Sequence, residues 1–273
     1  MQPLIHQATV LNHIEVKKDI FRIQLVAPEL ARRSRPGQFL QVRVSATYDP
    51  LLPRPISLHH IDPHEGTVTL LYHRVGRGTA LLAQCKAGEK IEIWGPLGRG
   101  WSLPGDKNVP AQSVVPIYVA GGIGIAPLLP LAEAWSSVGN PGILLCGGRC
   151  EEQLVAVDDF RTRGVFVDLA TEDGSCGHYG RVTDLFDTLP LQGRQPILYT
   201  CGPMGMLKAI HELATDKGWL CQVSLEERMG CGLGACLSCV CKTKAEQEGK
   251  VWTHSKICTD GPVFWSKEVI WDG

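Results

Sequence analysis

Short runs in which apolar and polar residues alternate fill the first hundred positions of the chain. The runs are rich in β-branched residues, and glycine and proline separate them at spacings typical of tight turns. A helical repeat is evident only at 78–85. Short alternating strands joined by turns indicate an antiparallel β-barrel, which we expect over residues 1–104. The expected strands lie at 9–16, 21–28, 39–45, 56–62, 67–75 and 90–96.

After a polar connector at Ser102–Gln112, continuous apolar runs alternate with segments of helical character. Strands buried on both faces, each followed by a helix, predict an α/β doubly wound parallel sheet over residues 112–221. The expected strands are 114–120, 142–148, 165–170 and 197–202, and the expected helical segments are 127–138, 151–162, 179–189 and 204–218. From residue 222 to 273 the chain is rich in cysteine and glycine and does not repeat this unit, so we expect a small separate domain there.

Charge and hydropathy narrow the classes of protein to consider. A formal net charge of -1 without any block of like charges argues against nucleic acid or an anionic membrane as partner. The uncharged stretch 114–132 contains Pro116, Pro127 and Pro130, which favour a strand, a turn and a helix start over a membrane span. The first residues lack the pattern of a secretory signal, so we expect a cytoplasmic protein. There the odd count of 11 cysteines favours metal ligands over disulfides.

One group of cysteines has the spacing of a metal centre. Cys231, Cys236 and Cys239 form the CxxxxCxxC run of plant-type [2Fe–2S] clusters. Cys258 is the favoured fourth ligand, because a hairpin can return it to the loop. Cys241, the alternative, follows Cys239 too closely and is expected on a strand that turns it away. A four-thiolate zinc site and unliganded thiols remain open as other interpretations.

Two glycine-rich turns follow apolar strands and begin helices. In the segment 120–129 the glycines allow a dinucleotide to approach the backbone, although Pro127 stands where the GxGxxG pattern has its third glycine. The segment 200–206 is a second such turn, suited to cover the nicotinamide end. Tight packing alone would explain either turn as well. The residues expected at the nucleotide are Gly121, Gly122, Gly124, Cys201, Gly202 and Pro203.

A third set of residues lies in the predicted barrel. Arg54 offers a bidentate fork for a phosphate, and Ser57 offers a hydroxyl donor. Gly78 and Thr79 have the pattern of a helix start that could hold a diphosphate. An arginine beside a proline is usually a solvated turn, but together these residues supply what a flavin dinucleotide needs.

In these motifs the chain resembles the ferredoxin-reductase superfamily and, within it, the electron transfer subunits of type B dihydroorotate dehydrogenases. The resemblance spans essentially the whole chain, and its most specific parts are SLEERMGCGLGACLSCVCK (224–242) and CTDGPVF (258–264). It implies that Arg54 holds the pyrophosphate of FAD and that Ser57 lies near flavin N5. The FAD residues implied are Arg54, Pro55, Ile56, Ser57, Leu71, Tyr72, His73, Gly78 and Thr79.

The resemblance also implies a function and a partner. An FMN-containing subunit would oxidise dihydroorotate in pyrimidine synthesis, and this oxidoreductase subunit would pass the electrons through its cluster and FAD to NAD. Two copies of each chain would form a heterotetramer, with the apolar segment 261–265 as a candidate contact. Arg149 stands where an acidic residue would favour NAD over NADP, so that choice depends on the resemblance.

Two other functions stay open at this point. One is a related reductase subunit that serves a ferredoxin, a hydrogenase or an oxygenase. The other is a zinc-stabilised nucleotide-binding module without redox activity. Nothing in the sequence suggests an eightfold strand-helix repeat or a base for dihydroorotate oxidation, so we expect no catalytic residue for that step in this chain.

Overall fold

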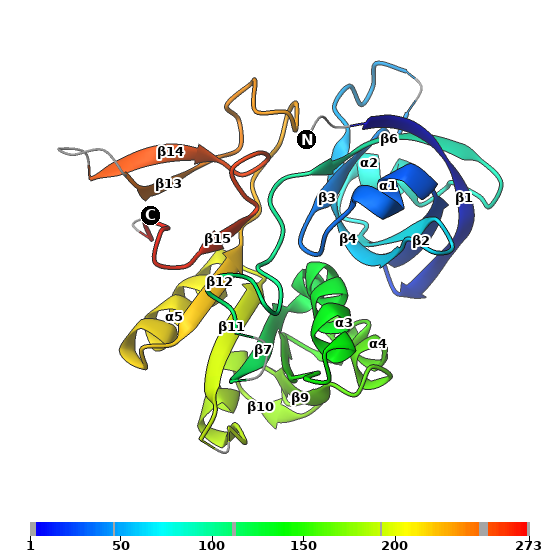
Figure 1. Ribbon diagram of the computed structural model, residues 1–273. Coiled ribbons are helices and arrows are strands. Elements are labelled where there is room, and N and C mark those ends of the chain that lie inside the picture. Colours follow the sequence, from blue (N-terminus) through cyan, green and yellow to red (C-terminus); the bar gives the residue numbers. More distant parts are fainter. Residues whose placement is uncertain (1–3, 46, 111–112, 192, 246–250, 272–273) are drawn as a thin grey trace.

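The first unit is a closed six-stranded barrel, as predicted. The computed structural model describes residues 4–45, 47–110, 113–191, 193–245 and 251–271 (Figure 1). Neighbouring barrel strands are antiparallel in the order β1-β2-β5-β4-β3-β6. The strands are β1 (Leu4–Lys17), β2 (Ile20–Val26), β3 (Phe39–Val42), β4 (Arg54–Asp62), β5 (Thr67–His73) and β6 (Lys90–Leu97).

Two short helices belong to the barrel. The helical repeat predicted at 78–85 corresponds to α2 (Arg77–Leu82). A second helix, α1 (Pro28–Arg33), was not predicted, because six residues are too few to display a helical repeat. Leu30 and Ala31 of α1 are fully buried in the core of the barrel, and this packing stabilises a helix too short to persist alone.

The second unit is a seven-stranded sheet in the order β10-β9-β8-β7-β11-β12-β15. All neighbours are parallel except the edge strand β15, which is antiparallel to β12. The order reverses between β7 and β11, and this is the switch point at which doubly wound sheets bind ligands. The strands are β7 (Val114–Gly121), β8 (Ile143–Gly148), β9 (Phe166–Thr171), β10 (His178–Tyr179), β11 (Gln195–Cys201), β12 (Leu220–Ser224) and β15 (Val263–Trp265).

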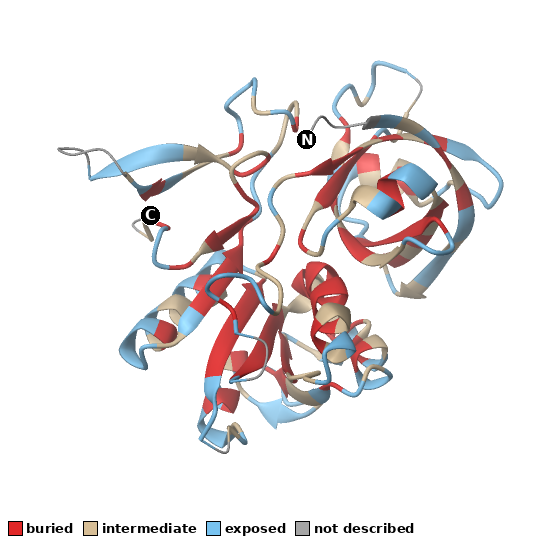
Figure 2. Cartoon of the chain, viewed as in Figure 1, coloured by how far each residue is buried: buried red, intermediate tan, exposed pale blue. Residues whose placement is uncertain are grey.

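Helices cover both faces of this sheet, which confirms the doubly wound architecture. One core packs Trp135 and Phe160 against the sheet, and the other packs Phe186 and Ile210 against its opposite face. The central strands of the sheet are largely buried between these layers (Figure 2). The segments predicted at 151–162 and 179–189 are mainly short or 3-10 helices. The elements are η1 (Gly122–Leu128), α3 (Leu129–Ser137), η2 (Glu151–Gln153), α4 (Val157–Arg161), η3 (Val182–Thr188) and α5 (Met204–Asp216).

The cysteine-rich segment leaves the sheet and returns to it. After β12 the chain forms a loop and an antiparallel hairpin of β13 (Val240–Lys244) and β14 (Trp252–Lys256), and then enters the sheet as β15. The proposed domain boundaries stay predictions. The strand β12 runs across the boundary between residues 221 and 222, and residue 112, where the nucleotide domain was expected to begin, lies outside the described residues.

The segment 261–265 is not an exposed contact, which corrects the expectation from the sequence. Val263 and Phe264 are only 6% and 7% exposed. Both belong to β15 and pack in the chain's own cores, so their side chains are not available to a partner.

The uncharged stretch 114–132 forms β7, η1 and the first turn of α3. Of the helices within the described ranges, none combines the length and the apolar character needed to cross a membrane.

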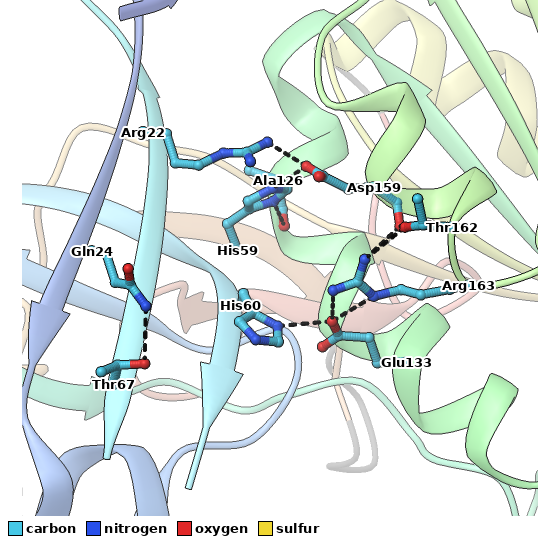
Figure 3. A network of polar contacts seen from close by, with 10 residues as sticks. All are labelled: Arg22, Gln24, His59, His60, Thr67, Ala126, Glu133, Asp159, Thr162 and Arg163. Carbon is cyan, nitrogen blue, oxygen red and sulfur yellow. Dashed lines mark hydrogen bonds and ion pairs between the residues drawn. The ribbon is translucent and has the colours of Figure 1, made fainter. Parts of the chain in front are cut away.

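A polar network joins the barrel to the sheet (Figure 3). His59 of β4 is almost completely buried; its Nδ1 lies 3.1 Å from the carbonyl oxygen of Ala126 and its Nε2 lies 3.3 Å from Asp159 of α4. Arg22 of β2 also pairs with Asp159. Burial alone would raise the pKa of Asp159, but the contact with His59 and the charge of Arg22 outweigh it and hold this pKa below its usual value.

A second carboxylate repeats this arrangement a short way along the same interface. Glu133 of α3 lies 2.8 Å from Nδ1 of His60 and accepts a hydrogen bond of 2.6 Å from Nε of Arg163. The two carboxylates therefore fix β4 against α4 and α3, while His59 also contacts η1 through Ala126.

Candidate functional site

A cavity of about 380 Å³ lies between the barrel and the sheet. The strands β4 and β5 contribute one wall of it, because their ends lie next to each other at this side of the barrel. The structure brings together in this wall Arg54, Pro55, Ile56, Ser57, Leu71, Tyr72, His73 and Thr79 from the set predicted for FAD.

Gly78, the remaining member of the set, makes room for Arg54. A Cβ atom at position 78 would lie 2.2 Å from Nε of Arg54, so only glycine lets the guanidinium lie across the start of α2. Nη1 of Arg54 donates to the carbonyl oxygen of Leu52 at 2.5 Å, which holds the side chain in place. Oγ1 of Thr79 accepts hydrogen bonds from the backbone N–H groups of Val75 and Gly76 and orders the turn. A fixed guanidinium at the cavity suits a phosphate.

Gly78→Ala is expected to weaken FAD binding by about tenfold, which corresponds to roughly 1.4 kcal/mol, because the new methyl group displaces the guanidinium. The dissociation constant of FAD, measured by flavin fluorescence, checks this. The matched control is Gly76→Ala, since a Cβ there meets nothing within 4 Å and the residue is extended. Equal FAD affinity in the two variants would show that Arg54 does not hold the cofactor.

The ring of Tyr72 is fixed from behind the cavity wall. It stacks on Phe21 with ring centroids 5.6 Å apart, and its hydroxyl lies 2.9 Å from Nε2 of His13. Burial raises the pKa of Tyr72 well above its usual value, so the phenol stays neutral. The ring packs in the core of the barrel and stiffens the cavity wall from within.

The opposite wall of the cavity was not predicted from the sequence. It comes from η1 and from the segment that precedes the cysteine loop, and the added residues include Ile123, Pro127, Ser224, Glu226 and Met229. Glu226 is exposed to the cavity, and desolvation by the surrounding protein raises the pKa of its carboxyl. The position of SLEERM immediately before the cysteine motif was the only available sign of this wall.

A second cavity, of about 620 Å³, lies outside the carboxyl ends of the sheet strands. Gly121, Gly122 and Pro203 line it. Gly124 and Gly202 instead hold the two turns together. A Cβ on Gly124 would lie 2.3 Å from the carbonyl oxygen of Cys201, and one on Gly202 would lie 2.9 Å from the backbone nitrogen of Gly121. These two glycines are required for close packing of the turns.

Cys201 is fully buried behind these turns and does not line the nucleotide cavity. Burial raises the pKa of its thiol well above the usual value, so the sulfur remains protonated. The residue is therefore a neutral packing partner of the site.

The far end of the nucleotide cavity is charged. Arg149 follows β8, and its backbone N–H donates to Oε1 of Gln153 at 2.9 Å. Glu172 and Arg181 also line this end and were not predicted. Glu172 follows β9 and lines the cavity. It supplies an acidic side chain at this end, where the sequence has Arg149 at the position at which an acidic residue would favour NAD.

The cysteine loop directs backbone N–H groups toward sulfur. The N–H groups of Leu233 and Cys236 donate to Sγ of Cys231, with N···S distances of 3.3 and 3.4 Å. Burial acts to raise the pKa of Cys231, but these hydrogen bonds outweigh it and lower the pKa to about 7. Gly232 and Gly234 have φ values of +70° and +80°, which favour glycine and let the loop turn back on itself. A thiol with a lowered pKa is prepared to bind a metal.

The four predicted ligands form two pairs. Cys231 lies beside Cys236, and Cys239 lies beside Cys258, whose thiol pKa rises to about 12 through burial and through this contact. The hairpin returns Cys258 as expected: the N–H of Ile257 donates to the carbonyl oxygen of Cys239 at 2.8 Å. Within the described ranges no His, Cys, Asp or Glu side chains converge as a set of three or more on one metal ion. Two pairs suit a two-iron centre, in which each iron takes two thiolates.

Cys241 occupies a different position in the hairpin. It pairs with Ser255 across β13 and β14, and burial raises the pKa of its thiol to about 11. The assignment of Cys258 as fourth ligand stays a prediction, which the geometry of the second pair supports.

These features together define an iron–sulfur reductase of the ferredoxin-reductase type. A barrel and a doubly wound sheet enclose one cavity, the switch point opens a second, and a cysteine loop adjoins the first. Solved structures agree with this class. An NADH-dependent reduced ferredoxin-NADP oxidoreductase is 28% identical, with a TM-score of 0.83 over 97% of this chain and 90% of that chain. The cytochrome b5 reductase domain of Ulva prolifera nitrate reductase shares the fold, with a TM-score of 0.64, 17% identity and coverage of 79% and 94%.

Sequence comparisons narrow the class to one family. Residues 226–270 match the iron-sulfur cluster binding domain of dihydroorotate dehydrogenase B. The dihydroorotate dehydrogenase B (NAD(+)) electron transfer subunit of Desulforamulus reducens is 37% identical over 98% of this chain and 99% of its own length. That of Geobacillus kaustophilus is 38% identical over 96% and 97%. The chain belongs to the family of dihydroorotate dehydrogenase B electron transfer subunits.

Proposed function

We propose that this chain accepts electrons from a dihydroorotate-oxidising FMN subunit and delivers them through a [2Fe–2S] centre and FAD to NAD⁺ in pyrimidine synthesis. The names of its relatives and the iron-sulfur domain at 226–270 support this route. The iron-sulfur match also favours a cluster over zinc at the four cysteines.

The adjacency of the three sites is the observation that carries the proposal. Within η1 and the residue before it, Gly121 and Gly122 line the nucleotide cavity while Ile123 and Pro127 line the flavin cavity. The segment 224–229 lines the flavin cavity and leads directly into Cys231. FAD, when bound, exchanges a hydride with a nicotinamide and single electrons with an iron–sulfur centre.

The residues of the chain bind and orient these groups. Arg54 would hold the FAD pyrophosphate, and the packing of Tyr72 on Phe21 would keep the barrel wall of the cavity rigid. The turn after β7 would hold the dinucleotide, and the turn after β11 would cover its nicotinamide end. Cys201 packs behind this junction as a neutral thiol, because burial raises its pKa well above the usual value.

Dihydroorotate oxidation is assigned to the partner subunit. The described strands form a six-stranded antiparallel barrel, a seven-stranded sheet and a two-stranded hairpin, none of which is an eight-stranded parallel barrel. A complex of two FMN subunits and two copies of this chain is part of the proposal. So is a cytoplasmic location, since all cysteines are free thiols, as expected in a reducing compartment.

Reconstitution tests this function. The chain is co-purified with a co-expressed dihydroorotate-oxidising FMN subunit from the same organism, and NADH formation is followed after dihydroorotate is added. We expect NADH formation that requires both chains. The similarity to the NADH-dependent reduced ferredoxin-NADP oxidoreductase, at 28% identity, favours a second candidate function, a reductase that exchanges electrons with ferredoxin. Rapid NADH formation from reduced ferredoxin, with none from dihydroorotate, would select that candidate.

A further inference from the structure

Gln41 is a buried amide without a hydrogen-bond partner. Its side chain lies on β3 and is completely inaccessible to solvent. Neither Nε2 nor Oε1 has a hydrogen-bond partner among the residues that the structure describes. An unpaired buried polar group costs about 1–3 kcal/mol, so a glutamine that served only for packing would be a poor choice here.

The side chain of Gln41 faces out of the barrel, toward the cysteine loop. Leu40 and Val42 belong to the core of the barrel, whereas Phe39 belongs to the core shared with the sheet and the cysteine-rich segment. Because side chains alternate along a strand, Gln41 faces the same side as Phe39. It is covered there by Gly232, which follows Cys231.

The contact with Gly232 is close enough to exclude any other residue. A Cβ atom at position 232 would lie 2.7 Å from Nε2 of Gln41 and 2.8 Å from its Cγ. The backbone of the loop, with its cysteine ligands on either side, thus lies directly against the amide. An N–H donor aimed at a cluster loop is one of the levers that set an iron–sulfur potential.

We propose that the side-chain amide of Gln41 donates a hydrogen bond to a sulfur atom of the [2Fe–2S] centre and so raises its reduction potential. This inference rests on the proposed function and adds a residue that tunes the same site. Hydrogen bonds to sulfur stabilise the extra negative charge of the reduced cluster more than the oxidised form. The amide N–H therefore favours acceptance of the electron.

The position of Gln41 also couples the cluster to the flavin motif. Gln41 is paired with Pro55 on the neighbouring strand β4, and Pro55 lines the flavin cavity next to Arg54. The paired strands β3 and β4 therefore carry both the amide that faces the cysteine loop and residues of the flavin cavity wall. The hydrogen bond would fix the cluster loop relative to this frame.

Gln41→Leu in the complete chain with both cofactors tests the proposal, because leucine keeps most of the volume and removes the amide. We expect the ratio of reduced to oxidised cluster at a fixed potential to fall by about tenfold, a shift of roughly 59 mV for one electron. The potential is measured by redox titration with detection of the reduced cluster by electron paramagnetic resonance. FAD content and affinity should not change.

Gln222→Leu is the matched control. Gln222 is also buried, but Oε1 accepts from the N–H of Ser102 at 2.9 Å and Nε2 donates to Oγ of Ser102 at 2.8 Å. Its loss should lower stability without moving the cluster potential. Equal potentials in wild type, Q41L and Q222L, with the cluster present in each, would overturn the proposal and leave the proposed function intact. A wild-type protein without any cluster would overturn both.

A second measurement decides the matter if Q41L does not assemble a cluster. Wild type and Q222L are labelled with ¹⁵N in glutamine side chains and reduced, and pulsed electron paramagnetic resonance is used to detect coupling between the cluster and a side-chain nitrogen. We expect the same coupling in both proteins. Its absence would mean that the amide is satisfied by water or not at all, and would refute the proposal.

Discussion

Cys258→Ser yields a chain that retains FAD but lacks the [2Fe–2S] cluster. The variant removes one thiol from the pair formed with Cys239, and the second iron then has a single protein ligand. Dihydroorotate-dependent NAD⁺ reduction should fall by more than about 100-fold. Loss of a residue that only hydrogen-bonds to a metal ligand costs up to roughly that factor, and this variant loses a ligand itself. Iron and sulfide content, with the spectrum of the reduced protein, checks this.

Cys241→Ser is the control for that experiment. The thiol of Cys241 is half-buried in the same hairpin, and serine can replace it opposite Ser255 without strain. The cluster should persist. The reverse result, an intact cluster in C258S and a lost one in C241S, would reassign the fourth ligand to Cys241.

Gly124→Ala should reduce kcat/KM for NAD⁺ by about 100-fold, the scale of a displacement of about 1 Å at a reacting centre. The new Cβ would lie 2.3 Å from the carbonyl oxygen of Cys201 and 2.8 Å from the nitrogen of Gly202. Both are backbone atoms, so the turns after β7 and β11 must separate. Steady-state kinetics over a range of NAD⁺ concentrations measures the effect.

Two controls separate this effect from unfolding. The FAD and iron contents of G124A should equal those of wild type, and Gly76→Ala, which adds the same methyl group in open space, should retain full kcat/KM. An unchanged kcat/KM in G124A would show that NAD⁺ reduction does not depend on the close contact between the two turns.

The order and class of the elements could be predicted because local patterns determine them. Short β-branched runs with partial alternation mark the six barrel strands, and apolar runs mark four of the parallel strands, β7, β8, β9 and β11. The helix α1 could not be predicted, because its stability comes from burial of Leu30 and Ala31 rather than from a repeat. The strands β10, β12 and β15 were missed for a similar reason, since each is short and becomes a strand by pairing with a neighbour in the sheet.

The candidate site was predictable where a motif is continuous in sequence. The flavin wall from β4 and β5 and the cysteine run belong to that kind. Residues such as Ser224 and Ile123 reach the flavin cavity only through the docking of sheet on barrel, which is a long-range contact. Gln41 was invisible because FLQV is an ordinary alternating strand, and its polar position becomes unusual only once Gly232 covers it.

The path of the cysteine-rich segment has a mechanical consequence. The segment leaves the sheet from β12 and re-enters it as β15, the strand adjacent to β12. A segment anchored at both ends to neighbouring strands cannot swing between donor and acceptor like a carrier on a flexible arm. Electron delivery to this chain therefore depends on how accurately a partner docks, and the rate should be insensitive to solvent viscosity once the complex has formed.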